Sequence, residues 1–495
     1  MSENLSKYFY EHMDKSKGLQ HFMHKTKIVA TVGPACSSFE KLLELARAGV
    51  NVFRLNFSHG SHEDKLKIIE YIRAISKSEP FNTAILADLQ GPKLRIGDIE
   101  NNEILIKKDD IITFSNIPCL GTINRISVHY TTLTKDVTVG ERILIDDGKL
   151  EVEILEIVNE NDIKVKVIYG GILSSKKGFN LPNTNTSMPA LTEKDIIDLD
   201  FIIKNNCDWV ALSFVRRVDD IRKVKEILNK NHSKIKIVAK IEKPEAVKNI
   251  NGIINITDAI MIARGDLGVE MPIEEIPLIQ KEIIKKCIHF AKPVIVATQM
   301  MESMIDRVKP NRSEVTDVAN AVIEGTDAVM LSAETATGNN PVLVVETMRK
   351  IIRQVEENGY NYNRGDLQPQ NSSPTLLSDA ICYNTCRIAA EINAQAIIGA
   401  TKSGYTAFTL SSYRPKLPLF IFTQEKSIVN QLCLSFGIRA FYYAEEKEID
   451  DIIFDQISIL KERGFLKQND IILSANSTPV HLHLATNMIK ITKVE

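Results

Sequence analysis

Two segments from the middle of the chain indicate how it folds, DAIMIARGD at residues 258–266 and PVIVATQ at residues 293–299. Each contains a short apolar run that ends in polar residues, and a longer amphipathic segment separates the two. Runs that stay apolar instead of alternating are typical of parallel strands covered on both faces. The two segments and the helix between them therefore predict a strand–helix–strand unit of an α/β protein.

The same unit recurs through most of the chain. The other runs are KIVATVG (27–33), NVFRLNFS (51–58), TAILADLQ (83–90), DWVALSF (208–214), KIVAKIE (236–242) and DAVMLSAET (327–335). Eight units in about 330 residues predict a (β/α)8 TIM barrel. The alternative is an open doubly wound sheet, but its G-x-G-x-x-G fingerprint is missing. Ser37 with Glu40, and Ser61 with Asp64, have the spacing of helix capping pairs.

The chain departs from this pattern twice. Short alternating runs between turns predict an inserted antiparallel β-domain, a small β-barrel lid. A polar linker precedes three further runs, AQAIIGAT (394–401), LPLFIFT (417–423) and DIILSAN (470–476), which predict a C-terminal α/β domain. The predicted boundaries are 1–24 for an N-terminal tail, 25–91 and 190–357 for the barrel, 92–189 for the insert and 358–495 for the C-terminal domain.

Composition and charge exclude several classes of protein. The 495 residues are 44% hydrophobic and 25% charged, with 61 basic against 63 acidic side chains, a net charge of −2. This is the balance of a globular protein of about three domains, and it argues against nucleic-acid binding through overall positive charge. No stretch approaches the roughly 18 apolar residues of a membrane helix, so a cytoplasmic protein without membrane contact is expected. Seven scattered cysteines indicate reduced thiols.

Polar side chains lie at the same end of many predicted strands. They are Arg54, Asn56, Ser58 and His59 after the second strand, Asp88 after the third, Lys240 and Glu242 after the fifth, Asp266 after the sixth, Thr298 and Gln299 after the seventh, and Ser332 and Glu334 after the eighth. Active sites of barrels lie at the carboxyl ends of the strands. Because polar groups at strand ends cost free energy unless they are paired, this set predicts an active-site rim.

Three charged residues of this rim predict a metal site. Glu242 and Asp266 on adjacent strands offer two carboxylates, which suits Mg²⁺ because this ion keeps water and substrate oxygens as ligands. Lys240 shares a strand face with Glu242. It is predicted either to form a salt bridge or to neutralise a transferring phosphoryl group.

Basic residues flank the insert at both ends. Lys93 and Arg95 lie at its entrance, and Lys176 and Lys177 at its exit. They fit a lid that closes over a polyphosphate, although solvated lysines would give the same pattern. The residues thus predict a Mg²⁺-dependent barrel enzyme that acts on phosphorylated or carboxylated anions, and they leave phosphoryl transfer and carbon–carbon chemistry both open.

Eight motifs add a family resemblance. They are KIVATVGPAC, FRLNFSHG, ADLQGPKLRIG, KIEKPEAV, ARGDLGVE, ATQMMESM, PNRSEVTDVANAV and MLSAETATG, in this order. The set resembles pyruvate kinase over essentially the whole chain from Lys25. The resemblance implies a glycolytic enzyme that transfers the phosphoryl group of phosphoenolpyruvate to ADP, giving pyruvate and ATP. It also implies a cytosolic, allosteric homotetramer.

The resemblance implies a role for each matching residue. Arg54 resembles the arginine that binds the substrate phosphate, and Lys240 the lysine that stabilises the transferring phosphoryl group. Gly265, Asp266 and Thr298 resemble the groups that hold the substrate carboxylate, and Glu242 and Asp266 resemble the Mg²⁺ or Mn²⁺ ligands. Ser332 and Glu334 match a polar network linked to protonation of the enolate. Asn56, Ser58, His59, Arg95 and Lys177 resemble nucleotide contacts, and Asn56, Ser58 and Asp88 a monovalent-cation site.

The sequence differs from K⁺-requiring members at Lys93, where these typically carry a glutamate, and at Leu89, Gln90 and Ile96. An ammonium group can stand where a bound K⁺ would otherwise neutralise carboxylate and phosphate charge. The sequence therefore predicts that K⁺ is not required.

The C-terminal domain carries a loop, TKSGYTA (401–407), that resembles the family's effector phosphate site. Its candidate residues are Thr401, Lys402, Ser403, Gly404 and Thr406. The later loop 476–487 lacks the Trp and Arg that grip a second phosphate, which favours AMP or a sugar monophosphate as activator. His481 and His483 in this later loop are expected to be exposed. A lyase or aldolase and a catalytically silent sensor remain the alternative functions.

Overall fold

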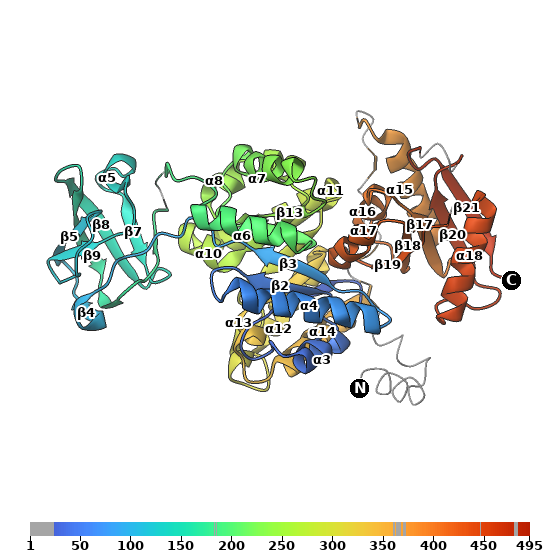
Figure 1. Cartoon of the computed structure of the whole chain (residues 1–495), viewed down its shortest axis with the longest axis horizontal. Coiled ribbons are helices and arrows are strands. Elements are labelled where there is room, and N and C mark those ends of the chain that lie inside the picture. The colour runs from blue at the N-terminus through green and yellow to red at the C-terminus, as the bar shows by residue number, and fades with distance from the viewer. Residues whose placement is uncertain are drawn as a thin grey trace.

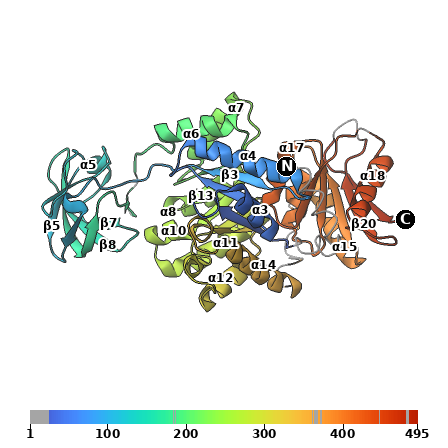
Figure 2. The same cartoon turned by 60° about the horizontal axis from the view of Figure 1, so that its bottom comes forward.

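A computed structural model describes residues 24–182, 184, 186–359, 362, 368–369, 373–445, 447–479 and 484–495. Three bodies lie in a row in both views, with the inserted domain at one end, the barrel in the middle and the C-terminal domain at the other end (Figures 1 and 2). Residues 1–23 of the expected tail, and His481 and His483, lie outside the described residues. His24, at the end of that tail, is buried and contacts Asn51 at 3.1 Å.

The middle body is a closed parallel barrel, which confirms the predicted (β/α)8 fold. Its strands are β1 (Lys27–Thr31), β2 (Val52–Asn56), β3 (Ala84–Asp88), β12 (Trp209–Leu212), β13 (Lys236–Ile241), β14 (Ala259–Ala263), β15 (Val294–Ala297) and β16 (Ala328–Leu331). They follow one another around the barrel in chain order. Alternate residues such as Val29, Trp209 and Met261 form one buried cluster, and their neighbours pack against the surrounding helices. Burial on both faces is the reason for the unbroken apolar runs.

Helices cover the outside of the barrel. They are α3 (Phe39–Ala48), α4 (His62–Ser78), α6 (Glu193–Lys204), α7 (Val218–Lys230), α8 (Pro244–Lys248), α9 (Ile250–Ile256), α10 (Arg264–Glu270), α11 (Ile276–His289), α12 (Arg312–Glu324), α13 (Ala333–Ala336) and α14 (Pro341–Glu357). The predicted capping box of Ser61 and Asp64 is present at α4. The prediction for Ser37 is wrong, because Ser38 is the extended residue that directly precedes α3 and accepts from the Lys41 amide at 3.2 Å.

The inserted domain is built almost entirely of β-strands. These are β4 (Glu103–Ile106), β5 (Ile111–Ser115), β6 (Arg125–Ser127), β7 (Arg142–Ile145), β8 (Leu150–Ile157), β9 (Asp162–Tyr169), β10 (Gly171–Ser174) and β11 (Phe179–Asn180), with a short helix α5 (Leu133–Asp136). Six strands form a sheet in the order β11-β7-β8-β9-β5-β6, and β10 pairs with β4. All pairs are antiparallel except β5 with β6. Bridges from Arg95 to Gly178 and from Ile96 to Val128 connect the two edges of the large sheet.

The C-terminal domain is a five-stranded sheet with helices. Its elements are α15 (Leu376–Glu391), β17 (Ala396–Ala400), α16 (Tyr405–Ser412), β18 (Leu419–Thr423), α17 (Lys426–Gln431), β19 (Ile438–Tyr442), α18 (Ile449–Glu462), β20 (Ile471–Asn476) and β21 (Met488–Lys493). The three predicted strands are β17, β18 and β20, and they are parallel. The structure adds parallel β19 and antiparallel β21 at the two edges.

The junction with the barrel is polar and buried. Arg414 donates to Asp327 at 2.7 Å and to the Gly325 carbonyl, while the Trp209 indole donates to the Gln431 carbonyl.

All seven cysteines are free thiols. Within the described part of the chain, no helix is both long enough and apolar enough to cross a bilayer.

Candidate active site

The buried centre of the candidate site is a charged cluster at the carboxyl ends of β2, β3 and β13. Arg54 donates from Nε to Asp88 Oδ2 at 2.7 Å. Lys240 Nζ lies 3.3 Å from Asp88 Oδ1 and 2.9 Å from Glu242 Oε1. Strand register explains the contact between Arg54 and Asp88. Asn56 pairs with Asp88 across β2 and β3. Arg54 lies two positions before Asn56, so the side chains of Arg54 and Asp88 lie on the same face of the sheet. Four predicted rim residues therefore form one continuous network of ion pairs.

The protonation states of this cluster follow from burial and charge. Burial works to raise the pKa of Asp88, but Lys240 and Arg54 outweigh it and hold the pKa below its ordinary value. Burial would lower the pKa of Lys240, yet Asp88 and Glu242 raise it above its usual value. For Glu242, burial and the nearby charge of Asp266 raise the pKa, although Lys240 opposes them. Lys240 is thus a permanent cation at neutral pH.

Glu242 and Asp266 are the carboxylates of the rim that could hold a divalent metal ion. Glu242 uses Oε1 for Lys240 and Oε2 for the amide of Phe214, at 2.6 Å. Asp266, in the first turn of α10, has no hydrogen bond or ion pair with any described residue. The charge of Asp266 acts on Glu242, so a cation between them would relieve repulsion. Among the described residues, no group of three or more His, Cys, Asp or Glu side chains could hold a metal ion.

Thr298 follows β15 in an unusual backbone conformation. The backbone φ is 69° at Thr298 and 54° at Gln299. A β-branched residue such as threonine rarely adopts a positive φ. The Thr298 hydroxyl accepts from the Gly265 amide at 2.7 Å, and the Thr298 carbonyl accepts from Arg264 at 2.7 Å. Such strain persists only where surrounding contacts fix it, and it is typical of functional sites. The turn after β14 and the end of β15 are thereby connected.

The partly buried Ser332 and the buried Glu334 form a second polar group after β16. The Glu334 carboxylate accepts from the Ser332 amide at 2.6 Å and from the Met301 amide at 3.1 Å. Burial raises the pKa of Glu334 above its ordinary value, although these amides oppose the shift. The arrangement gives a carboxyl group that can hold or release a proton closer to neutral pH.

The remaining barrel residues lie near the rim without joining the charged cluster. Asn56 Oδ1 accepts from the Ser58 amide at 3.0 Å, while His59 is exposed. Lys93 is exposed and lines a hollow between insert and barrel together with Asp147 and Asp266. The side chains of Arg54, Asp88, Lys240 and Glu242 are in contact, whereas those of Asn56, Ser58 and His59 make no hydrogen bond or ion pair with them.

The predicted lid cations contact atoms of the lid itself. Arg95 Nη1 donates to the Lys176 carbonyl at 3.0 Å, and Lys177 Nζ lies 2.8 Å from Asp146. In the C-terminal domain, Thr401 Oγ1 accepts from the Gly404 amide at 2.9 Å and Ser403 Oγ from the Tyr405 amide at 3.4 Å. Neither group lies in the charged cluster of the barrel.

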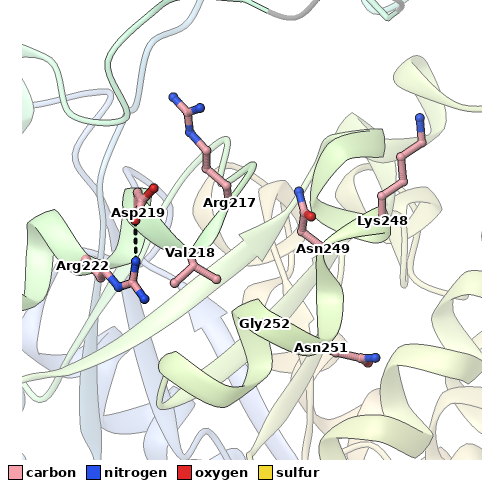
Figure 3. A pocket seen from close by; sticks show the side chains of 8 residues that line it. All are labelled: Arg217, Val218, Asp219, Arg222, Lys248, Asn249, Asn251 and Gly252. Carbon is pink, nitrogen blue, oxygen red and sulfur yellow. Dashed lines mark hydrogen bonds and ion pairs between the residues drawn. The ribbon is translucent and has the colours of Figure 1, made fainter.

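Another hollow of about 370 Å³ lies on the flank of the barrel, between the start of α7 and helices α8 and α9 (Figure 3). Arg222 is paired with Asp219 at 2.7 Å, and the side chains of Arg217 and Lys248 point outward (Figure 3). None of the predicted site residues lines this hollow. It is therefore separate from the rim.

Sequence reasoning missed three residues of the site. Ser213 Oγ accepts from Lys240 at 2.7 Å, and Thr31 Oγ1 accepts from Arg54 Nη1 at 2.9 Å. Arg264 reaches Asp317 at 2.6 Å besides the Thr298 carbonyl. Thr31 and Ser213 end or directly follow β1 and β12, so the positional signal that identified the other rim residues would have found them.

Comparison with known proteins identifies the family. Residues 23–345 match the family model "Pyruvate kinase, barrel domain", and residues 379–492 match "Pyruvate kinase, alpha/beta domain". The chain belongs to the pyruvate kinase family. It is 43% identical to the pyruvate kinase of Clostridium perfringens, over 95% of this chain and all of that protein. It is 40% identical to the pyruvate kinase of Geobacillus stearothermophilus, over 94% of this chain and 80% of that protein.

A solved structure agrees. The crystal structure of a pyruvate kinase from Cryptosporidium parvum superposes with a TM-score of 0.90 at 34% identity, covering 98% of this chain and 99% of that one. The predicted family, fold class and activity are confirmed. Pyruvate kinases transfer the phosphoryl group of phosphoenolpyruvate to ADP, and the chain is a glycolytic phosphotransferase of this kind. Family members use a divalent metal ion.

Proposed function

We propose that phosphoryl transfer from phosphoenolpyruvate to ADP takes place at the charged cluster of the barrel rim. One observation supports this assignment most strongly: a buried Lys240 that stays cationic between Asp88 and Glu242. Charge spreads over the phosphoryl oxygens during transfer, so fixed positive charge and positioning supply most of the catalysis. A permanent ammonium in a site shielded from water is well suited to that task.

Each side chain of the site has a proposed task. Arg54, held by Asp88 and Thr31, binds the phosphate of the substrate. Lys240 neutralises the phosphoryl group as it moves. Thr298 and the backbone at Gly265 hold the substrate carboxylate in this proposal, since the Thr298 hydroxyl and the Gly265 amide lie within hydrogen-bond distance of each other at the rim.

The metal ion and the proton complete the reaction. Glu242 and Asp266 would hold Mg²⁺ or Mn²⁺. When bound, the ion supplies positive charge to the phosphoryl and enolate oxygens. Ser332 and Glu334 belong to the network through which a proton reaches the methylene carbon, and the raised pKa of Glu334 supports proton storage there.

The lid is proposed to supply the nucleotide contacts. Arg95 and Lys177 are partly buried cations of the inserted domain, where Lys177 pairs with Asp146 and Arg95 donates to the Lys176 carbonyl. Asn56, Ser58 and His59 approach the same phosphates from the barrel, and carbon–carbon chemistry needs no such second phosphate site. ADP-dependent formation of pyruvate therefore separates a kinase from the alternative lyase or aldolase.

K⁺ is proposed to be unnecessary. Asn56, Ser58 and Asp88 are the candidate monovalent-cation ligands, and the side chain of Lys93 lines the hollow between insert and barrel that Asp266 also lines. Steady-state kinetics with phosphoenolpyruvate, ADP and Mg²⁺ in tetramethylammonium buffer should give full activity. Strong activation by KCl would refute the role of Lys93, and absence of pyruvate formation would refute the proposed site.

Regulation and assembly are proposed from the C-terminal domain and the barrel surface. Thr401, Lys402, Ser403, Gly404 and Thr406 would bind a monophosphate activator, which a panel of AMP, sugar monophosphates and fructose 1,6-bisphosphate tests. Exposed apolar side chains on the barrel and the unpaired edge of β21 support a homotetramer, because such surfaces are normally covered. Sedimentation analysis of the full chain tests this assembly. The cytoplasmic location stays a prediction.

A further inference from the structure

A single buried carboxylate connects the lid, the helix α10 that carries the proposed metal ligand Asp266, and the segment after β13. Glu270 is the last residue of α10, and its Oε1 accepts from Lys243 Nζ at 2.5 Å and from Asn180 Nδ2 at 2.6 Å. Asn180 belongs to β11 in the lid. Lys243 directly follows Glu242, and α10 also carries Asp266. Both views place α10 on the side of the barrel that faces the lid (Figures 1 and 2).

The two donors are important because Glu270 is deeply buried. Its side chain is 1% exposed, and its second oxygen, Oε2, has no hydrogen-bond partner among the described residues. A buried carboxylate is costly unless its charge is paired and hydrogen-bonded. Lys243 supplies the balancing charge, and Asn180 supplies the second donor. A hydrogen bond to an ionised acceptor is about twice as strong as a neutral one.

The contact fixes a part of the lid that the proposed reaction uses. Asn180 lies three residues after Lys177, and Gly178 between them bridges Arg95. The orientation of β11 therefore sets the positions of both proposed nucleotide cations. Gly148 of the lid also approaches Val269, the neighbour of Glu270, since a Cβ placed on Gly148 would lie 4.0 Å from Val269 Cγ1.

We propose that Glu270 is a positioning residue that latches the lid through Asn180 and so holds the nucleotide-binding cations above the metal site. The inference rests on the proposed function of Arg95 and Lys177. It predicts that the latch affects ADP rather than phosphoenolpyruvate, because the proposed phosphoenolpyruvate contacts all lie on the barrel.

The first test removes the lid side of the latch. Asn180→Ala should raise the KM for ADP about tenfold, the factor that corresponds to about 1.4 kcal/mol. The KM for phosphoenolpyruvate and kcat should change less than about twofold. Thr184→Ala is the matched control, because its hydroxyl donates to Glu141 of the same domain at 2.7 Å. An unchanged KM for ADP in Asn180→Ala would overturn the positioning role.

The second test exchanges donor and acceptor. N180D alone places two carboxylates together, and E270Q alone leaves Lys243 without its counter-charge. The double variant N180D/E270Q restores one carboxylate and one amide beside Lys243. Its KM for ADP should lie closer to the wild-type value than that of N180D. A double variant whose effect equals the product of the two single effects would contradict direct contact between the residues.

The third test follows the lid without any substrate. Hydrogen exchange measured on the full chain should show faster exchange in residues 176–181 and 264–271 of Asn180→Ala, with the barrel strands unchanged. If Asn180→Ala and the wild-type chain showed the same exchange rates in both regions, the proposed latch would be overturned. This readout also separates the two hypotheses: a wild-type chain that forms no pyruvate overturns the proposed function, while the exchange result still decides whether the lid is latched.

Discussion

Replacement of Lys240 by methionine tests the central claim about the site. Lys240 Nζ lies 2.9 Å from Glu242, 3.3 Å from Asp88 and 2.7 Å from Ser213 Oγ. Methionine fills a similar volume without charge. Loss of one preorganised electrostatic donor lowers kcat by roughly 10²–10³, and loss of one partner of a buried ion pair costs about 3–5 kcal/mol of folding free energy. Both effects are expected in Lys240→Met.

Two measurements separate these effects. Pyruvate formation coupled to lactate dehydrogenase gives kcat, and urea unfolding at pH 7 gives the free energy of unfolding. Lys204→Met is the matched control, since its ion pair with Asp200 is exposed at 2.6 Å and should change neither value measurably. The activity must be measured where circular dichroism shows a folded variant. Near-normal turnover of folded Lys240→Met would refute the electrostatic role of this lysine.

Three further predictions concern neighbours of Lys240. Thr31→Val removes the hydroxyl that accepts from Arg54 at 2.9 Å. Because hydrogen bonds to charged groups are worth about 1.5–3 kcal/mol, the KM for phosphoenolpyruvate should rise about tenfold or more. Thr31→Ser keeps the hydroxyl and should retain wild-type kinetics. The lowered pKa of Asp88 means that its contribution to stability is present above about pH 4 and lost as pH falls through that lowered value. The difference in unfolding free energy between wild type and Asp88→Asn should therefore stay constant from about pH 8 to about pH 5 and shrink in more acidic urea titrations. Lys93→Glu should create a requirement for K⁺, seen as activation by KCl but not by tetramethylammonium chloride, and an unaltered salt response would contradict the proposed substitution of an ammonium for the ion.

The local pattern of the sequence determined the barrel. Its strands are buried on both faces, so each was visible as an unbroken apolar run, and the order of runs such as 258–266 and 293–299 was enough to predict the parallel connections. The burial of the strands also made the rim residues predictable from the sequence. A polar residue that ends a buried strand has few explanations other than a site, and Arg54, Asp88 and Lys240 stood at such positions.

Contacts between distant segments were decided only by the tertiary structure. β21, which is antiparallel, and β6, which pairs in parallel with β5, lie at sheet edges, where one side of the backbone is unpaired and the apolar signal is weak. The amide of Met301 binds Glu334, and Asn180 binds Glu270, across 33 and 90 positions of sequence. No short-range pattern encodes such pairs, because they depend on how packed elements close on one another.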